Sequence, residues 1–219
     1  MSKLLFGLAA IAGIAAVTYQ FAVKPFRSWG LSPEEATATL PGDEVVPDAV
    51  GGETRAITID APPASVWPWL VQMGSGRGGW YSYDSMDPGV SSRVVLPEFQ
   101  ELAEGDMVPT SPQGGLVVRR LDPEQALVLY FDSDMSAKQS GSKSPMEFSV
   151  TWAFVLEPLP GNRTRLIERI RYRFGETDKP WIRYTLPVMG FGVFVVLRKQ
   201  LEGIKERAEQ APEPVKATA

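Results

Sequence analysis

One carboxylate in the sequence occupies a position where it could take part in chemistry. Residues 163–174 are predicted to form a strand, which places Glu168 on one face with large apolar residues. These neighbours are Leu166, Ile170, Tyr172 and Phe174. A carboxylate among apolar side chains is desolvated, which raises its pKa unless a cation pairs with it. Glu168 is therefore a candidate to bind a ligand hydroxyl or to act as a general acid or base.

Two structural interpretations of Glu168 remain open beside the functional one. A β-bulge in residues 163–174 would turn the side chain outward. A buried ion pair would stabilise the carboxylate without giving it any chemical role.

The densest aromatic cluster is Trp80, Tyr81 and Tyr83, followed by Asp84. Tyr and Trp combine a large apolar body with one polar group. The cluster is suited to line the mouth of a cavity, where phenol hydroxyls orient the polar end of a ligand. In the alternative interpretation, the aromatic rings fill the core and Asp84 caps a turn.

The glycine-rich residues 74–79 (GSGRGG) formally match the dinucleotide-binding pattern G-x-G-x-x-G. That pattern needs a strand before it and a helix after it. Here a predicted helix precedes it and the aromatic cluster follows, so a turn is the better interpretation. Arg77 within this turn is a candidate to contact an anionic ligand or lipid headgroup.

The composition excludes several kinds of chemistry. The chain has no cysteine and no histidine, which removes disulfides, thiolate nucleophiles, His-based triads and Cys- or His-ligated metals. With 22 basic and 26 acidic side chains, its net charge of −4 argues against nucleic-acid binding. We predict neither a metal nor a cofactor. Catalysis, if present, depends on carboxylates, Lys, Arg, Tyr, Ser or Thr.

The elements that position these residues follow from periodicity. Strands are predicted over 54–60, about 106–110, 115–121, 125–132, 148–156 and 163–174, the last two joined by a turn at 158–162. Helices are predicted over 62–73, with Pro68 expected to kink the chain, and over 182–210. The order of elements indicates an α+β fold, an antiparallel sheet with helices on one side.

Residues outside this domain have a different character. The uncharged stretch 4–23 has the 20 residues that a membrane-spanning helix needs, so residues 1–27 are predicted to be a transmembrane anchor. A cleaved signal peptide and a buried helix are the alternatives. Residues 28–52 are predicted to be a linker with one short helix beginning at Ser32, residues 53–210 the domain, and 211–219 a disordered tail. The flanking charges leave the side of the membrane open.

Three segments resemble the START-like SRPBCC superfamily: residues 56–84 (with APPASVW at 61–67), 152–158 (WAFVLEP) and 201–208 (LEGIKERA). They are similar to uncharacterised, membrane-tethered bacterial members of that group. The resemblance implies a helix-grip fold, in which an antiparallel sheet wraps around a long C-terminal helix beside a hydrophobic cavity. Relatives bind lipids, sterols, hormones or polyketides, and some are cyclases. The superfamily has no universal catalytic set to transfer.

The sequence therefore favours a membrane-tethered module that binds a hydrophobic small molecule or lipid between sheet and C-terminal helix. A cyclase, dehydratase or hydrolase using Glu168 with Tyr83 or Tyr172 is the alternative, and an envelope scaffold with a vestigial cavity is a third. The candidate ligand-binding residues are Trp67, Arg77, Trp80, Tyr81, Tyr83, Asp84, Trp152, Phe154, Glu168 and Tyr172.

Two polar regions have less specific interpretations. The basic row Arg165, Arg169, Arg171 and Arg173 is expected to be a solvated sheet face paired with Glu157 and its neighbours, or a stripe that contacts anionic lipid. The polar stretch 132–145 is expected to be an exposed connection or a mobile lid.

Overall fold

The computed structural model describes residues 28–85, 89–111, 114–142, 147–175 and 182–210, and for residues 182–191 the backbone alone. The predicted anchor at 1–27 and the predicted tail at 211–219 lie outside the described residues. Within those residues, no helix combines the length and the apolar character needed to cross a membrane.

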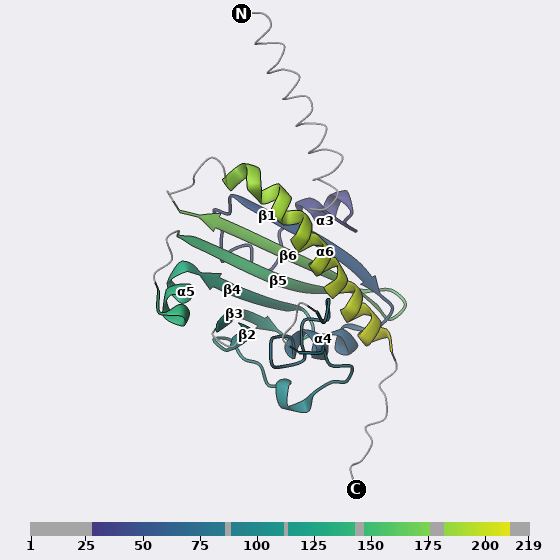
Figure 1. Cartoon of the computed structure of the whole chain (residues 1–219). Coiled ribbons are helices and arrows are strands. Elements are labelled where there is room, and N and C mark those ends of the chain that lie inside the picture. The colour runs from purple at the N-terminus through teal and green to yellow at the C-terminus, as the bar shows by residue number, and fades with distance from the viewer. Residues whose placement is uncertain (1–27, 86–88, 112–113, 143–146, 176–181, 211–219) are drawn as a thin grey trace, which may run out of the picture.

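A six-stranded antiparallel sheet forms the centre of the domain, in the order β1-β6-β5-β4-β3-β2 (Figure 1). Every strand predicted from periodicity is present, and β1 begins three residues earlier than predicted. The bounds are β1 Gly51–Ile59, β2 Met107–Ser111, β3 Gly114–Asp122, β4 Ala126–Asp132, β5 Phe148–Leu159 and β6 Arg163–Phe174. The predicted α+β arrangement of an antiparallel sheet and a C-terminal helix is confirmed.

One face of the sheet, here the inner face, is covered by α4 (Pro63–Val71) and α6 (Ile182–Glu209). Helix α6 runs obliquely across β1 and β6 and ends beside α4 (Figure 1). Its Leu201 and Ile204 are fully buried in the same core cluster as α4. Burial of such apolar side chains stabilises the sheet–helix contact by roughly 1.5–3 kcal/mol each. Pro68 lies inside α4 as predicted.

The opposite face, here the outer face, is covered by most of residues 28–50, which we call the strap, whereas Trp29 at its start packs against Phe194 of α6 and the inner-face core. The strap contains α3 (Pro33–Thr37), whose predicted start is confirmed by a capping box between Ser32 and Glu35. After α3 the strap is irregular, as its prolines and glycine suggest. It is nevertheless packed, because Leu40 and Val46 are only 5% and 2% exposed.

The arginine row of β6 is paired with carboxylates of the strap, so its interpretation as a solvated face paired with Glu157 is wrong. Its members donate to carboxylates of the strap: Arg165 to Glu35 at 2.7 Å, Arg169 to Asp43 at 2.7 Å and Arg173 to Asp48 at 2.9 Å. The hydrogen bond from Arg165 lowers the pKa of Glu35. Ion pairs between β6 and the strap thus replace solvation of the arginines by water.

The polar stretch after β4 is a helix where the sequence predicts a connection or lid. Helix α5 covers Ser133–Ser140, and the Asp132 side chain accepts a hydrogen bond from Met135 N at 2.8 Å. Gly141, at φ 70°, follows the helix in the left-handed conformation that glycine favours. A good N-cap and a C-terminal glycine outweigh the poor helix propensity of the serines between them.

Candidate functional site

Glu168 points into the inner face from the middle of β6, between Arg55 of β1 and Phe154 of β5. Its side chain is fully buried. Oε1 accepts a hydrogen bond from Trp152 Nε1 at 2.7 Å, and Oε2 lies 3.7 Å from Arg55 Nη1. The pairing of β6 with β5 runs without a break from residue 163 to 174, which excludes the β-bulge. The inward orientation predicted from alternation is confirmed.

Burial raises the pKa of Glu168 to about 7. The positive charge of Arg55 and the hydrogen bond from Trp152 act in the opposite direction but do not compensate for desolvation. Near neutral pH the carboxyl group therefore populates both its protonated and its ionised form. This is the range in which a carboxyl group exchanges protons readily.

Arg55 is the cation beneath the site, and its side chain is also fully buried. Its Nη2 pairs with Glu53, and its guanidinium lies 5.7 Å from the ring centre of Phe194 on α6. The distance of 3.7 Å to Glu168 allows an ion pair but is too long for a hydrogen bond. Arg55 Nε and Nη1 and Glu168 Oε2 have no hydrogen-bond partner among the described residues.

Two stacked indole rings adjoin the buried pair. Trp80 lies on Trp152 with ring centres 5.4 Å apart and an interplanar angle of 17°. The ring of Trp152 in turn lies beside that of Phe154, with ring centres 5.1 Å apart. Because the Trp152 N–H is bound to Glu168, a ligand that displaces or tilts this ring also perturbs the carboxyl group.

The inner face has two unlike halves, and Glu168 lies where they meet. One half is fully packed under α4 and the end of α6, and contains Ile59, Leu127, Leu156 and Leu166, each at most 3% exposed. The other half is only partly covered. Its half-buried residues are Phe131, Phe148, Val150, Ile170, Tyr172 and Phe174. A strip of apolar side chains thus leads from a partly exposed end of the sheet to a buried carboxyl group.

Tyr81, one of the candidate binding residues, belongs to the packed core. It is 1% exposed, and its hydroxyl donates to the Trp69 carbonyl at 3.0 Å. Burial raises the pKa of Tyr81. Its backbone carbonyl contacts α6 at Gly203, where a Cβ would come within 2.0 Å of the oxygen. Tyr81 therefore fixes the position of α6.

Residues 74–79 form the turn that the sequence favours over a dinucleotide site. Gly74 and Gly79 are paired across it. The Arg77 guanidinium donates to the carbonyls of Val71, Met73 and Phe99 at 3.1–3.2 Å. Two of these carbonyls lie at the end of α4 and the third belongs to the segment 97–99, so these donors of Arg77 serve the local fold.

The other candidates are dispersed. Trp67 is half-buried against the core, and Tyr83 is 42% exposed. Asp84 is exposed and accepts a hydrogen bond from Ser91 N at 3.3 Å, as expected for a residue that caps a turn. Tyr172 shares the inner face with Glu168, but four residues along a strand separate them by about 13 Å. Thus Trp80, Trp152 and Phe154 adjoin Glu168, whereas Tyr172 does not.

Sequence reasoning overlooked Arg55 and Glu53. The signal was present, because alternation places both on the same face as Ile57 and Ile59.

Among the described residues, no group of three acidic side chains is arranged to bind a metal ion.

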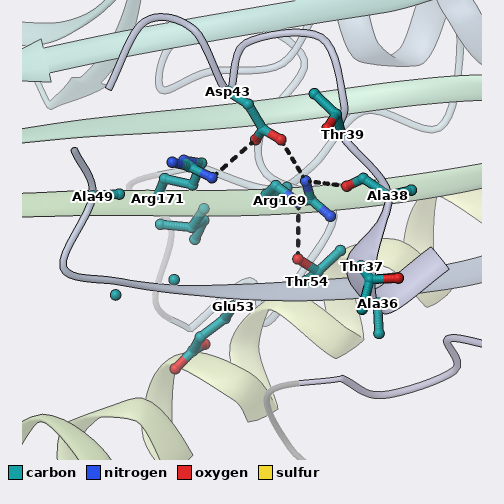
Figure 2. A pocket seen from close by; sticks show the side chains of 13 residues that line it. Ala36, Thr37, Ala38, Thr39, Asp43, Ala49, Glu53, Thr54, Arg169 and Arg171 are labelled. Atoms are coloured by element: carbon teal, nitrogen blue, oxygen red, sulfur yellow. Dashed lines mark hydrogen bonds and ion pairs between the residues drawn. The ribbon is translucent and has the colours of Figure 1, made fainter. Parts of the chain in front are cut away.

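A pocket of about 340 Å³ lies on the outer face, a location that the sequence does not predict. It is bounded by the strap on one side and by β1 and β6 on the other (Figure 2). Its walls include Asp43, Thr54, Arg169 and Arg171. The pocket and the Glu168 site lie on opposite faces of the same strand pair, because Thr54 pairs with Arg169 and Arg55 pairs with Glu168.

Comparisons with known proteins give no family for the chain. No family model matches it, and no curated protein is significantly similar in sequence. A protein from Arthrobacter aurescens has a solution structure with 17% identity and a TM-score of 0.44, covering 77% of this chain and 92% of that one. Protein NE0264 from Nitrosomonas europaea gives 16% identity and a TM-score of 0.43, with coverages of 72% and 94%. The KanY protein gives 12% identity and a TM-score of 0.41, with coverages of 73% and 98%. Similarities this weak assign no function, and the strand order with α6 across the sheet is itself consistent with a helix-grip fold.

Proposed function

We propose that this domain binds a hydrophobic small molecule or lipid on the inner face of the sheet, with the polar end of the ligand against Arg55 and Glu168. The observation that carries the proposal is that three buried atoms, Arg55 Nε, Arg55 Nη1 and Glu168 Oε2, have no hydrogen-bond partner among the described residues. Leaving a buried donor or acceptor unsatisfied costs about 1–3 kcal/mol. A ligand group that satisfies them gains that energy, and the half-buried apolar strip receives the rest of the molecule.

A hydroxyl group fits these atoms best. It can accept a hydrogen bond from Arg55 and donate its own proton to Glu168 Oε2. A ligand carboxylate would accept from Arg55 but would be repelled by the fraction of Glu168 that is ionised at neutral pH. An alcohol with an apolar body is therefore the preferred ligand class.

The first experiment is native mass spectrometry of the full chain purified in mild detergent, which reports any lipid that co-purifies. The second is titration of the delipidated chain with a pyrene-labelled long-chain alcohol and with its methyl ether. We expect the alcohol to bind at least tenfold more tightly than the ether, which cannot donate to Glu168. Binding should also change the fluorescence of the stacked Trp80 and Trp152.

The matched variants are Glu168→Gln and Glu157→Gln. Glu157 is exposed and lies at the far end of β5. Glu168→Gln should reduce the preference for the alcohol over the ether, whereas Glu157→Gln should leave it unchanged. Absence of binding by the wild-type chain, or equal binding of alcohol and ether, contradicts the proposal.

A second candidate function is proton transfer, as in a cyclase or dehydratase. It is favoured by a carboxyl group with a pKa of about 7 at the end of an apolar strip. In that case Tyr172 would not act directly with Glu168, because the two residues lie four positions apart along β6. For a ligand that is converted, Glu168→Gln should abolish turnover and retain binding. Unchanged turnover excludes this function.

We also propose that residues 1–27 hold this binding domain at a membrane. The support is the uncharged stretch at 4–23, long enough to span the hydrocarbon core. After expression of the full chain, the protein should stay in the membrane fraction during alkaline carbonate extraction. A variant lacking residues 4–23 should be released. Release of the full chain contradicts membrane anchoring.

A further inference from the structure

The pocket on the outer face has an uneven balance of charge. Asp43 lies between two guanidinium groups, with Oδ2 2.7 Å from Arg169 Nη1 and Oδ1 3.6 Å from Arg171 Nη1 (Figure 2). The Glu53 side chain points away from this group and pairs with Arg55 (Figure 2). Two cations therefore share one carboxylate at the pocket wall.

Elsewhere along the same row, each arginine has a carboxylate of its own. Arg165 pairs with Glu35, and Arg173 pairs with Asp48 and Glu147. The excess positive charge of the row is thus located at Arg169 and Arg171, beside the pocket. In a partly buried position, this charge attracts an anion more strongly than it would in water.

Hydrogen-bond donors accompany the charge. The Thr54 hydroxyl accepts from Arg169 Nε at 3.0 Å, which leaves its own proton available to an acceptor in the pocket. Arg171 Nη2 donates to the carbonyls of Val46 and Pro47 at 3.1 and 3.2 Å, whereas its buried Nε has no hydrogen-bond partner among the described residues. Arg169 is held in place by Asp43 and by the Ala38 carbonyl at 2.9 Å, so its guanidinium is preorganised.

We propose that this pocket binds a phosphate group, held by Arg169, Arg171 and Thr54. A volume of about 340 Å³ is at the small end of ligand pockets, which fits a compact anion or a headgroup and not a large molecule. Arginine is the side chain best suited to phosphate, because its planar fork of donors matches two oxygens at once. The site is independent of the function proposed for the inner face.

The experiment measures binding of inorganic phosphate and of dihexanoyl phosphatidic acid to the full chain by titration calorimetry. Arg171→Gln should weaken both by at least tenfold. The matched control is Arg173→Gln, which removes the same charge from the same face of the same strand but away from the pocket. It should change binding by less than twofold.

Thr54→Val tests the site without altering its charge, and decides the question if Arg171→Gln does not fold. It should weaken phosphate binding several-fold. Tighter binding of the short-chain lipid than of inorganic phosphate identifies a lipid headgroup as the source, and equal binding identifies a free phosphate or phosphate ester. The proposal is overturned if neither compound binds, if Thr54→Val has no effect, or if Arg173→Gln weakens binding as much as Arg171→Gln.

Discussion

Glu168 and Arg55 face each other across β6 and β1, 3.7 Å apart between Oε2 and Nη1, and neither side chain is exposed. This buried pair is loose: it is close enough for Coulomb attraction but leaves three atoms without hydrogen bonds to the described residues. A buried ion pair with such geometry contributes little net stability, because desolvation offsets attraction.

The raised pKa of Glu168 gives a specific pH dependence of stability. Between pH 4.5 and pH 7 the folded state retains a proton that the unfolded state has lost, so the free energy of unfolding decreases as pH rises. The expected decrease is about 3 kcal/mol. Glu168→Gln removes this contribution and keeps an acceptor for Trp152. In urea titrations at pH 5 and pH 8, the stability of wild type relative to Glu168→Gln should fall with pH. Parallel pH profiles of the two proteins contradict the assignment.

Removal of Arg55 should be costly at high pH and less so at low pH. Arg55→Met leaves Glu168 without its cation, and breaking a buried pair in this way costs about 3–5 kcal/mol. At pH 5 the protonated Glu168 needs no cation, so the loss in the free energy of unfolding should be smaller. Combining Arg55→Met with Glu168→Gln should recover part of the stability at pH 8. The same loss at both pH values, or no recovery in the double variant, would show that the two groups do not interact.

The contact of α6 with Tyr81 can be tested with two glycines of one helix. Gly203→Ala places a Cβ within 2.0 Å of the Tyr81 carbonyl oxygen, so the helix has to shift. We expect a loss of about 2 kcal/mol, within the usual cost of overpacking. Gly192→Ala meets no atom within 4 Å and should be neutral or stabilising by up to about 1 kcal/mol. Thermal unfolding of both variants compares them directly, and similar melting temperatures would place α6 elsewhere.

Docking of the strap depends on Asp43. Asp43→Asn weakens the attraction to Arg169 and Arg171, and we expect a loss of about 1–3 kcal/mol. Limited proteolysis should then cut the chain between residues 37 and 50 faster. Asp48→Asn, which removes an exposed partner of Arg173, should have a much smaller effect on both measurements. If the two variants are cut at the same rate, Asp43 does not hold the strap.

Alternation along the chain was enough to predict the sheet and the inward orientation of Glu168. In a strand, the face of a residue is decided by whether its position is odd or even relative to the apolar set. The same rule applied to β1 identifies Arg55. Neither step requires knowledge of which strands are neighbours.

The stacking of Trp80 on Trp152 and the pairing of Asp43 with Arg169 could not be predicted in this way. Both join segments that are distant in sequence: the first depends on how the loop after α4 meets β5, and the second on how the strap meets β6. The apolar residues of the strap follow neither a helical nor a strand spacing. The strap takes its conformation from its contacts with β6, which its own sequence does not reveal. Its composition therefore resembles that of a free linker.

The strap also constrains the order in which the molecule is completed. Its hydrogen bonds to Arg165, Arg169 and Arg173 join positions 130, 126 and 125 residues apart. During synthesis on the ribosome the strap emerges before every strand, whereas the strand that binds it emerges last. The carboxylates of the strap must therefore wait for β6, and the outer face cannot close until all six strands have been made.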